Sequence, residues 1–272
     1  MHCAGPSGDL TPSITDNETF TEPDIDTQNG SGSDPEMKRI LAYLVPANNK
    51  IINAQNGLAV PKARDALDKG KVVAVPTDTL YGLMTRIRYS DRLNRVKGRP
   101  KDKPFGLFVN SVEQIQKYSI PTVSNSILKK LLPGPVTVIF ERNEQLPASF
   151  NPGVNTVGFR IPHNQFVKNI CINYSEPLVQ TSANVSGSDL SPLCIEDFKE
   201  LWEDLGLIVD DGIIVENDGS RLGSTVVDLS VEGYYKVVRD GCALQETVKI
   251  LRSCGLAQLD EKAEAEKCDE NG

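Results

Sequence analysis

Residues 63–83, ARDALDKGKVVAVPTDTLYGL, hold the local pattern that decides the fold. The segment 63–69 has the composition of a short helix, Gly70 ends it, and the apolar run Val72–Val75 predicts a buried strand. A polar cluster, PTDTLYGL at 76–83, follows that strand directly. A helix, a strand and a polar loop in this order are typical of an α/β protein with functional groups at its strand ends.

The same alternation continues to about residue 253. Further helices are predicted at 92–97, 112–118, 124–132, 164–173, 195–204 and 243–253, and further strands at 106–109, 136–140, 156–161, 178–181, 208–209, 224–229 and 235–238. The elements show no repeating period, which excludes a solenoid. Several strands follow one another with only loops between them. We therefore expect an α/β fold with a twisted, mixed β-sheet flanked by helices.

Composition and charge limit the classes of function. The 272 residues are 39% hydrophobic and 24% charged, and the formal net charge is −8. No apolar run reaches the ~18 residues needed to cross a bilayer, so we expect no membrane span. The N-terminus lacks a basic stretch followed by an apolar one, and residues 1–36 contain no Arg or Lys. These features favour a cytoplasmic protein and leave a mitochondrial pool open.

The chain divides into a central domain and two tails. Residues 1–36 are polar, acidic and poor in apolar periodicity, which predicts a disordered tail. We interpret 37–59 as a linker or irregular lead-in and 60–253 as the folded domain. Residues 254–272 are predicted to form an acidic C-terminal tail.

The cysteines and histidines form no recognisable metal or nucleophile motif. The cysteines are widely spaced, with no CxxC pair, at Cys3, Cys171, Cys194, Cys242, Cys254 and Cys268. Reduced thiols are favoured over disulfides or a zinc site. His2 and His163 are too few for a His-rich cluster, and no GxSxG motif accompanies His163 for a Ser-His-Asp triad.

Basic residues concentrate in 84–103, where eight Arg or Lys and two Asp give a local charge of +6. Such a run is most often a solvated helix face. Here it overlaps the cluster KGRPKDKPFGLF at 97–108, in which Lys97 and Arg99 flank Gly98. Two cations beside a glycine can converge on a polyphosphate, because glycine allows close backbone approach.

Six polar or glycine-bearing clusters lie at predicted strand ends. They are PTDTLYGL at 76–83, KGRPKDKPFGLF at 97–108, PGPVTVIF at 133–140, NTVGFRIP at 155–162, TSANVSG at 181–187 and RLGSTVVDL at 221–229. Their hydroxyls, amide and cations suit an anionic ligand. Neither a P-loop motif nor a GxGxxG motif is present, so a phosphate site is built differently. In this order the clusters resemble the YrdC-like threonylcarbamoyl-AMP synthase family over residues 60–250, and most closely its short eukaryotic members.

The resemblance implies one YrdC-like catalytic domain with a concave basic cleft, and it implies a specific reaction. Members of the family condense L-threonine, bicarbonate and ATP into L-threonylcarbamoyladenylate and pyrophosphate. The product serves N6-threonylcarbamoyladenosine formation in ANN-decoding tRNAs, so downstream threonylcarbamoyl transferase machinery is an implied partner. Mg²⁺ is the implied cofactor, held mainly through the ATP phosphates.

The resemblance also assigns individual residues. It places Lys97, Arg99, Ser182 and Asn184 at the adenylation centre, Lys97, Arg99, Lys103, Thr156, Ser182, Ser191 and Arg239 around ATP, and Thr79, Arg160 and Ser224 around threonine. Two spacings agree with these roles. Ser182 and Asn184 are two residues apart, and Thr156 and Arg160 are four apart, so each pair shares one face of an extended backbone.

Three positions depart from the family pattern. Phe108 stands where some relatives have His, so that substrate contact is not assigned here. Arg-Asp-Gly at 239–241 replaces the usual Arg-Pro-Gly, and the match of Ser191 requires one inserted residue. Thr77 and Tyr81 are candidates to line the same cleft, with core packing favoured for Tyr81.

Two other functions remain open at this level. The first is carbamoyl-adenylate formation, as in the related domain of hydrogenase-maturation proteins, although their cysteine-rich zinc-finger motifs are missing from this sequence. The second is a non-catalytic module that binds double-stranded RNA or tRNA through a basic surface. Weak RNA binding is compatible with the enzymatic function, whereas the acidic total charge disfavours a dedicated RNA binder.

Overall fold

The computed structural model describes residues 50–188, 190–215 and 222–259, which lie in a compact unit assigned to Ala47–Gly272. The predicted disordered tail at 1–36, the first part of the lead-in and residues 260–272 of the acidic tail lie outside the described residues. Within the described residues, every helix is too short or too polar to cross a membrane.

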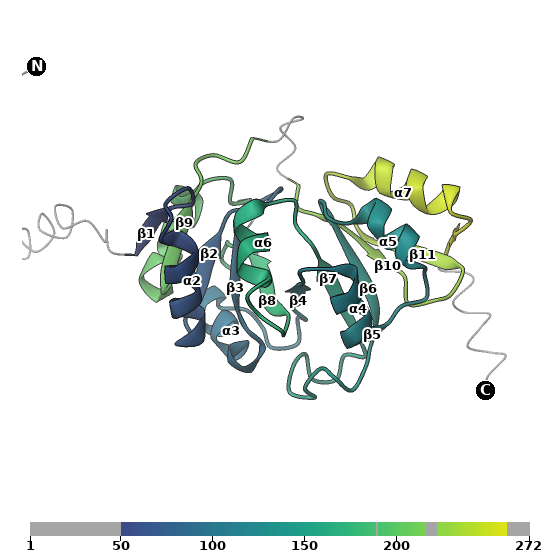
Figure 1. Cartoon of the computed structure of the whole chain (residues 1–272), viewed down its shortest axis with the longest axis horizontal. Helices are drawn as coiled ribbons and strands as arrows, with labels where there is room; N and C mark the ends of the chain where they lie inside the picture. Colours follow the sequence, from purple (N-terminus) through teal and green to yellow (C-terminus); the bar gives the residue numbers. More distant parts are fainter. Residues whose placement is uncertain (1–49, 189, 216–221, 260–272) are drawn as a thin grey trace, which may run out of the picture. The chain divides into compact units, whose positions relative to one another are not determined.

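Helices and short strands alternate along the described chain (Figure 1). The helices are α2 (Ala59–Asp68), α3 (Asp91–Lys97), α4 (Val112–Tyr118), α5 (Asn125–Leu131), α6 (Gln165–Cys171) and α7 (Leu244–Ser253), with 3₁₀ segments η1 (Ile87–Tyr89) and η2 (Ile195–Asp204). The strands are β1 (Ile51–Asn53), β2 (Val73–Val75), β3 (Gly82–Arg86), β4 (Gly106–Phe108), β5 (Ser119–Ile120), β6 (Val136–Arg142), β7 (Thr156–Arg160), β8 (Leu178–Ser182), β9 (Leu207–Asp210), β10 (Thr225–Asp228), β11 (Tyr234–Arg239) and β12 (Ala257–Gln258).

The strands form one mixed sheet in the order β1-β9-β2-β3-β8-β4-β7-β6-β10-β11-β12, with β5 beside β6. Parallel pairs such as β4–β7 and β6–β10 alternate with antiparallel pairs such as β3–β8 and β6–β7. The prediction of an α/β fold with a mixed sheet is therefore confirmed. Pairing between segments distant in the sequence places β3, β8, β4, β7, β6 and β10 side by side in this order.

The structure adds elements that the sequence did not predict. β1 lies inside 37–59, which was interpreted as a lead-in, and pairs in parallel with β9. β3 begins at Gly82, inside the polar cluster at 76–83, and β5 and β12 are only two residues long. The predicted helix at 195–204 is a 3₁₀ segment with non-helical backbone at Phe198. Strands this short leave too few residues for a clear alternating pattern, and their pairing depends on distant partners.

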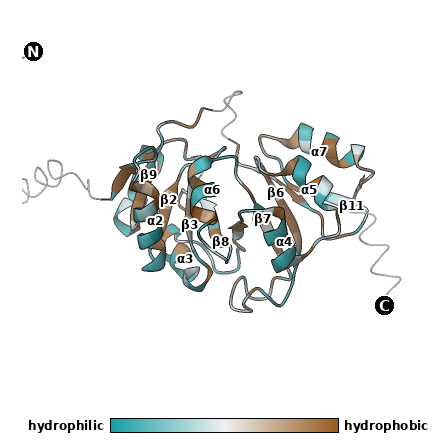
Figure 2. Ribbon diagram, viewed as in Figure 1, coloured by the Kyte–Doolittle hydropathy of each residue, from teal (hydrophilic) through white to brown (hydrophobic). Residues whose placement is uncertain are grey.

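Apolar side chains pack on both faces of the sheet. In β2, Val73 and Val75 belong to one cluster and Ala74 to the other, because successive strand residues point to opposite faces. Helix α2 contributes Ala63 and Leu67 to the first cluster, at the four-residue spacing of one helix face. Helices α2 and α6 pack together, as do α5 and α7 (Figure 1). In Figure 2 the strands contain brown, hydrophobic stretches, and the helices carry both brown and teal residues.

Candidate active site

A cavity of about 320 Å³ opens over the central strands of the sheet. Along β7, Thr156, Gly158 and Arg160 line the cavity and Phe159 packs into the core, while Val157 belongs to the core and also borders the cavity. Thr137 of β6 lines the same cavity. The predicted shared face of Thr156 and Arg160 is thus present, and this face of the sheet carries the polar groups.

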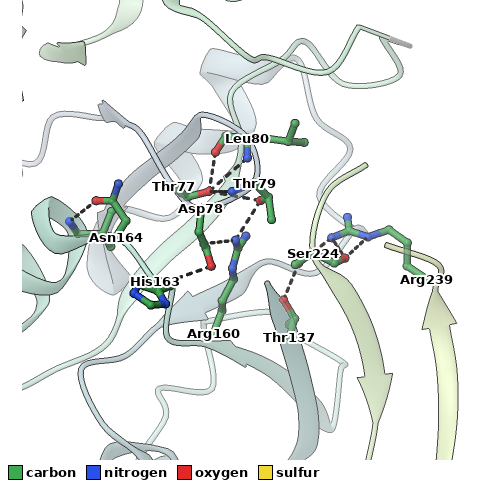
Figure 3. Close-up of polar contacts among 11 residues, drawn as sticks. Thr77, Asp78, Thr79, Leu80, Thr137, Arg160, His163, Asn164, Ser224 and Arg239 are labelled. Atoms are coloured by element: carbon green, nitrogen blue, oxygen red, sulfur yellow. Dashed lines mark hydrogen bonds and ion pairs between the residues drawn. The ribbon is translucent and has the colours of Figure 1, made fainter. Parts of the chain in front are cut away.

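Arg160 ends β7 and has a nearly buried side chain. Its Nη2 donates to Asp78 Oδ1 at 2.5 Å and to Thr79 Oγ1 at 2.9 Å (Figure 3). Its Nε is buried and has no hydrogen-bond partner among the described residues. A buried guanidinium is costly unless its charge is compensated, and Asp78 supplies that compensation. The unused Nε–H leaves a donor for a further acceptor.

The loop after β2 is held in shape by Thr77. Its Oγ1 accepts from the backbone N–H groups of Thr79 at 3.1 Å and Leu80 at 3.3 Å, and donates to the Leu80 carbonyl at 2.7 Å. A hydroxyl bonded to its own backbone in this way fixes a turn. The turn places the buried Thr79 hydroxyl against Arg160.

Ser224, directly before β10, lies between two other cavity residues. Its Oγ is 2.9 Å from Thr137 Oγ1, and Arg239 Nη2 donates to the Ser224 carbonyl at 2.7 Å and to its hydroxyl at 3.0 Å (Figure 3). A Cβ added at Gly241 would lie 2.2 Å from the Thr225 amide nitrogen. Gly241 of the Arg-Asp-Gly turn at 239–241 therefore allows the turn to pack directly against the backbone of Ser224.

Lys97 is the last residue of α3, which ends at Gly98 in a left-handed conformation. Although Lys97 is only 2% exposed, its Nζ donates to the Ser182 carbonyl and lies 3.2 Å from Asn184 Oδ1. Ser182 Oγ also donates to Asn184 Oδ1 at 2.5 Å. Burial, and then the charge of Arg99, lower the pKa of Lys97 to about 7. The polar oxygens favour the ammonium, but they carry no full charge and burial dominates.

Arg99 reaches the cavity from the loop after α3. Its Nη2 donates to the Pro104 carbonyl at 2.9 Å, and its guanidinium lies 5.1 Å from the Phe105 ring centroid. These contacts hold the side chain along the loop, and the charge of the nearby Asp102 acts on the guanidinium as well. Together with Arg160 and Arg239, it gives the cavity wall three guanidinium groups.

The structure brings most of the predicted site residues together, but not all of them. Thr79, Arg99, Thr156, Arg160, Ser182, Ser224 and Arg239 line the cavity. Lys97 and Asn184 lie behind the wall and reach it through Ser182. Lys103 is exposed and Ser191 is half-buried, and neither is part of the wall.

Sequence reasoning missed three polar residues of this region. Asp78 lies inside the quoted cluster 76–83, where an acid between two threonines was a visible signal. Gln180 and Thr137 line the cavity from within predicted strands. Gln180 is two residues before Ser182, so the same-face spacing identifies it. Tyr81 is fully buried in the core, as expected, and also borders the cavity, as does Phe108.

The donor set of the cavity suits anionic oxygens. Its described wall contains arginines, hydroxyls and one amide but no carboxylate. Across the described residues, no group of three or more His, Cys, Asp or Glu side chains is placed to hold a metal ion.

Comparison with known proteins identifies the family. The Sua5/YciO/YrdC family model, described as telomere recombination, matches residues 65–241, which is more than half of the chain. A threonylcarbamoyl-AMP synthase of Bos taurus is 46% identical over 195 residues, covering 70% of each chain. The Homo sapiens threonylcarbamoyl-AMP synthase is 44% identical over 191 residues, covering 68% of each chain. The chain belongs to the Sua5/YciO/YrdC family.

A solved structure agrees with this assignment. Pyrococcus abyssi Sua5 complexed with L-threonine is 28% identical and superposes with a TM-score of 0.67, covering 77% of this chain and 62% of the archaeal one. The present chain thus spans about three-fifths of that protein's length.

Proposed function

We propose that this chain is a threonylcarbamoyl-AMP synthase, which condenses L-threonine, bicarbonate and ATP into L-threonylcarbamoyladenylate and pyrophosphate. The main structural support is that three arginines and the hydroxyls of Thr79, Ser182 and Ser224 converge on one cavity. The similarity to named threonylcarbamoyl-AMP synthases at 44–46% identity supports the same reaction.

The reaction proceeds in two steps. The threonine amine first attacks the bicarbonate carbon, and loss of water leaves an N-carboxylate. An oxygen of this carboxylate then attacks the α-phosphorus of ATP, and the bond to the β-phosphate oxygen breaks to release pyrophosphate. Neither step requires a protein nucleophile. The chain has to position the reactants and offset the charge of the phosphates.

The polar groups of the cavity divide into two sets with different tasks. Arg160, Thr79 and Ser224 hold threonine, with the Arg160 guanidinium on its carboxylate. Lys97 and Arg99 offset the phosphate charge, and Ser182 and Asn184 orient the Lys97 amine toward the adenylation centre. Thr156 and Arg239 of the cavity wall complete this set. Lys103 and Ser191 lie outside the wall and are proposed as ATP contacts on the family resemblance alone.

Mg²⁺ enters as part of the nucleotide substrate, held mainly through the ATP phosphates. When bound, it supplies positive charge to the pyrophosphate leaving group. The carboxylate-free wall of the described cavity supports this mode of binding.

The proposed product is consumed by threonylcarbamoyl transferase machinery that modifies ANN-decoding tRNAs. Weak binding of tRNA or double-stranded RNA is a secondary proposal, supported by the exposed basic residues Arg88, Arg95, Lys101 and Lys103. A cytoplasmic location is proposed on the sequence pattern alone.

Pyrophosphate release tests the proposal directly, with ATP, threonine and bicarbonate each omitted in turn. Release should depend on all three compounds. Equal release without bicarbonate would reject the carbamoylation step. Release with carbamoyl phosphate in place of threonine and bicarbonate would favour carbamoyl adenylation, and no release under any condition would favour the RNA-binding alternative.

A further inference from the structure

Asp78 lies behind Arg160, outside the cavity wall. Its Oδ1 accepts from Arg160 Nη2 at 2.5 Å, and its Oδ2 accepts from the His163 backbone N–H at 3.0 Å (Figure 3). The two charged side chains are 7% and 11% exposed, for Arg160 and Asp78 respectively. Arg160 lines the cavity and Asp78 does not.

These contacts join two separate segments of the chain. Asp78 belongs to the loop after β2, whereas Arg160 and His163 belong to the end of β7 and the turn after it. With each oxygen of Asp78 bonded to a different group, its carboxylate has a fixed orientation. The Arg160 side chain is long and rotatable, so this fixed acceptor restricts where the guanidinium points.

Asp78 also offsets charge in the cleft. Arg160 and Arg239 both line the cavity, and their like charges repel across a partly desolvated space. The described wall contains no carboxylate, so Asp78 supplies the negative charge from behind it. The ion pair with Asp78 compensates the buried charge of Arg160, and its Nε has no hydrogen-bond acceptor among the described residues.

We propose that Asp78 is a positioning residue for amino-acid recognition: it holds the Arg160 guanidinium in the orientation that receives the threonine carboxylate. This inference rests on the proposed function. Asp78 acts through Arg160 and does not touch the reacting atoms, because its oxygens are occupied and it lies outside the wall.

The variant Asp78→Asn of the full chain keeps the shape of the side chain and removes its charge. Calorimetric titration should show threonine binding weakened by about tenfold or more, and binding of a non-hydrolysable ATP analogue changed by less than about twofold. The matched control is Asp68→Asn. Asp68 is one of two acidic partners of Arg86, with an N–O distance of 2.9 Å, and neither Asp68 nor Arg86 lines the cavity. The control should bind threonine like the wild type.

A double variant tests whether Asp78 acts through Arg160. In an Arg160→Lys background, Asp78→Asn should cause little further loss of threonine affinity, because the planar guanidinium group that Asp78 orients is already absent. Additive losses in the double variant would overturn the positioning role, as would wild-type threonine affinity in Asp78→Asn or loss of ATP affinity alone.

Asp78→Glu covers the case in which Asp78→Asn does not fold, since it keeps the charge and moves the carboxylate by one methylene. Weaker threonine binding with unchanged ATP binding supports the proposal, and wild-type threonine binding overturns it. If the wild-type chain itself binds no threonine, both the proposed function and this inference fail. Wild-type binding with an unaffected Asp78 variant rejects only the inference.

Discussion

At the scale of single residues, Lys97 combines deep burial with a lowered pKa. Its Nζ is surrounded by oxygens of Ser182 and Asn184, and it forms no ion pair with a carboxylate of the described chain. Such an amine can lose its proton near neutral pH and regain it when an anion arrives. A nucleotide phosphate in the adjacent cavity would be that anion.

Nucleotide binding should therefore take up a proton at pH 8. With a pKa of about 7 in the free protein, Lys97 is mostly neutral at that pH, and phosphate binding should draw in up to about 0.9 proton. Calorimetry in buffers of different ionisation enthalpy measures this uptake. It should shrink at pH 6 and vanish in Lys97→Met, but persist in Lys101→Met, an exposed lysine outside the proposed site. Equal uptake in wild type and Lys97→Met would contradict the assignment.

The lowered pKa of Lys97 also determines whether its burial makes the folded state more or less stable as the pH rises. The pKa of Lys97 falls from 10.5 to about 7 on folding, so between these values the unfolded chain binds more protons than the folded chain. The penalty of burying this lysine is therefore complete below pH 7 and is relieved as the pH rises toward 10.5.

Replacement of Arg160 by Lys separates the amino-acid site from the nucleotide site. Lysine keeps the positive charge but lacks the planar guanidinium that can donate two parallel hydrogen bonds to a carboxylate. Threonine binding should therefore weaken by about 1–3 kcal/mol, or roughly 5- to 150-fold. Affinity for a non-hydrolysable ATP analogue should stay unchanged. Calorimetric titration of both ligands into the folded variant checks this. Loss of ATP binding alone would mean that Arg160 contacts the nucleotide. The threonine and nucleotide ends of the cavity would then be exchanged, and the threonine roles proposed for Thr79 and Ser224 would be wrong.

At the scale of elements, the turn between β11 and α7 depends on Gly241. A side chain there would overlap the backbone at Ser224 and Thr225, with the nearest atom 2.2 Å from the added Cβ. Gly241→Ala should destabilise the fold by about 1–3 kcal/mol and lower the melting temperature by several degrees, because the obstructing atoms are backbone. Affinity for ATP and for threonine should both fall, since the disturbed contact joins Arg239, a proposed ATP residue, to Ser224, a proposed threonine residue.

Gly57→Ala is the matched control for this element. Nothing lies within 4 Å of a Cβ added at Gly57, so its melting temperature should stay close to that of the wild type. If Gly241→Ala melts like this control and binds ATP normally, the close approach of the turn has no structural role.

At the scale of the whole molecule, the described residues between 50 and 259 already supply two apolar clusters and the lining of the cavity. Residues 1–36 offer few apolar side chains to any core. Deletion of 1–36 should therefore leave both the melting temperature and the rate of pyrophosphate release nearly unchanged. Differential scanning calorimetry and the pyrophosphate assay on the shortened chain measure this. A drop of several degrees would show that the segment packs on the domain.

The sequence by itself determined the fold class and most of the helices and strands, and it identified seven of the residues that line the cavity: Thr79, Arg99, Thr156, Arg160, Ser182, Ser224 and Arg239. Secondary structure here depends on residues only a few positions apart. Apolar runs such as Val72–Val75 favour buried strands, and glycines such as Gly70 and Gly98 end helices. Local periodicity therefore predicts these elements. The same-face spacing of Thr156 and Arg160 was also readable, because it depends only on an extended backbone.

Only the tertiary structure decided which site residues contact each other, how deeply each is buried, and where the short edge strands form. Asp78 meets Arg160 across 82 positions, and Lys97 meets Ser182 across 85. The lowered pKa of Lys97 arises from burial by other segments, and β1 exists because β9 pairs with it. Ion pairing, desolvation and strand pairing all depend on distances between segments far apart in the sequence, and those distances are set only when the sheet assembles.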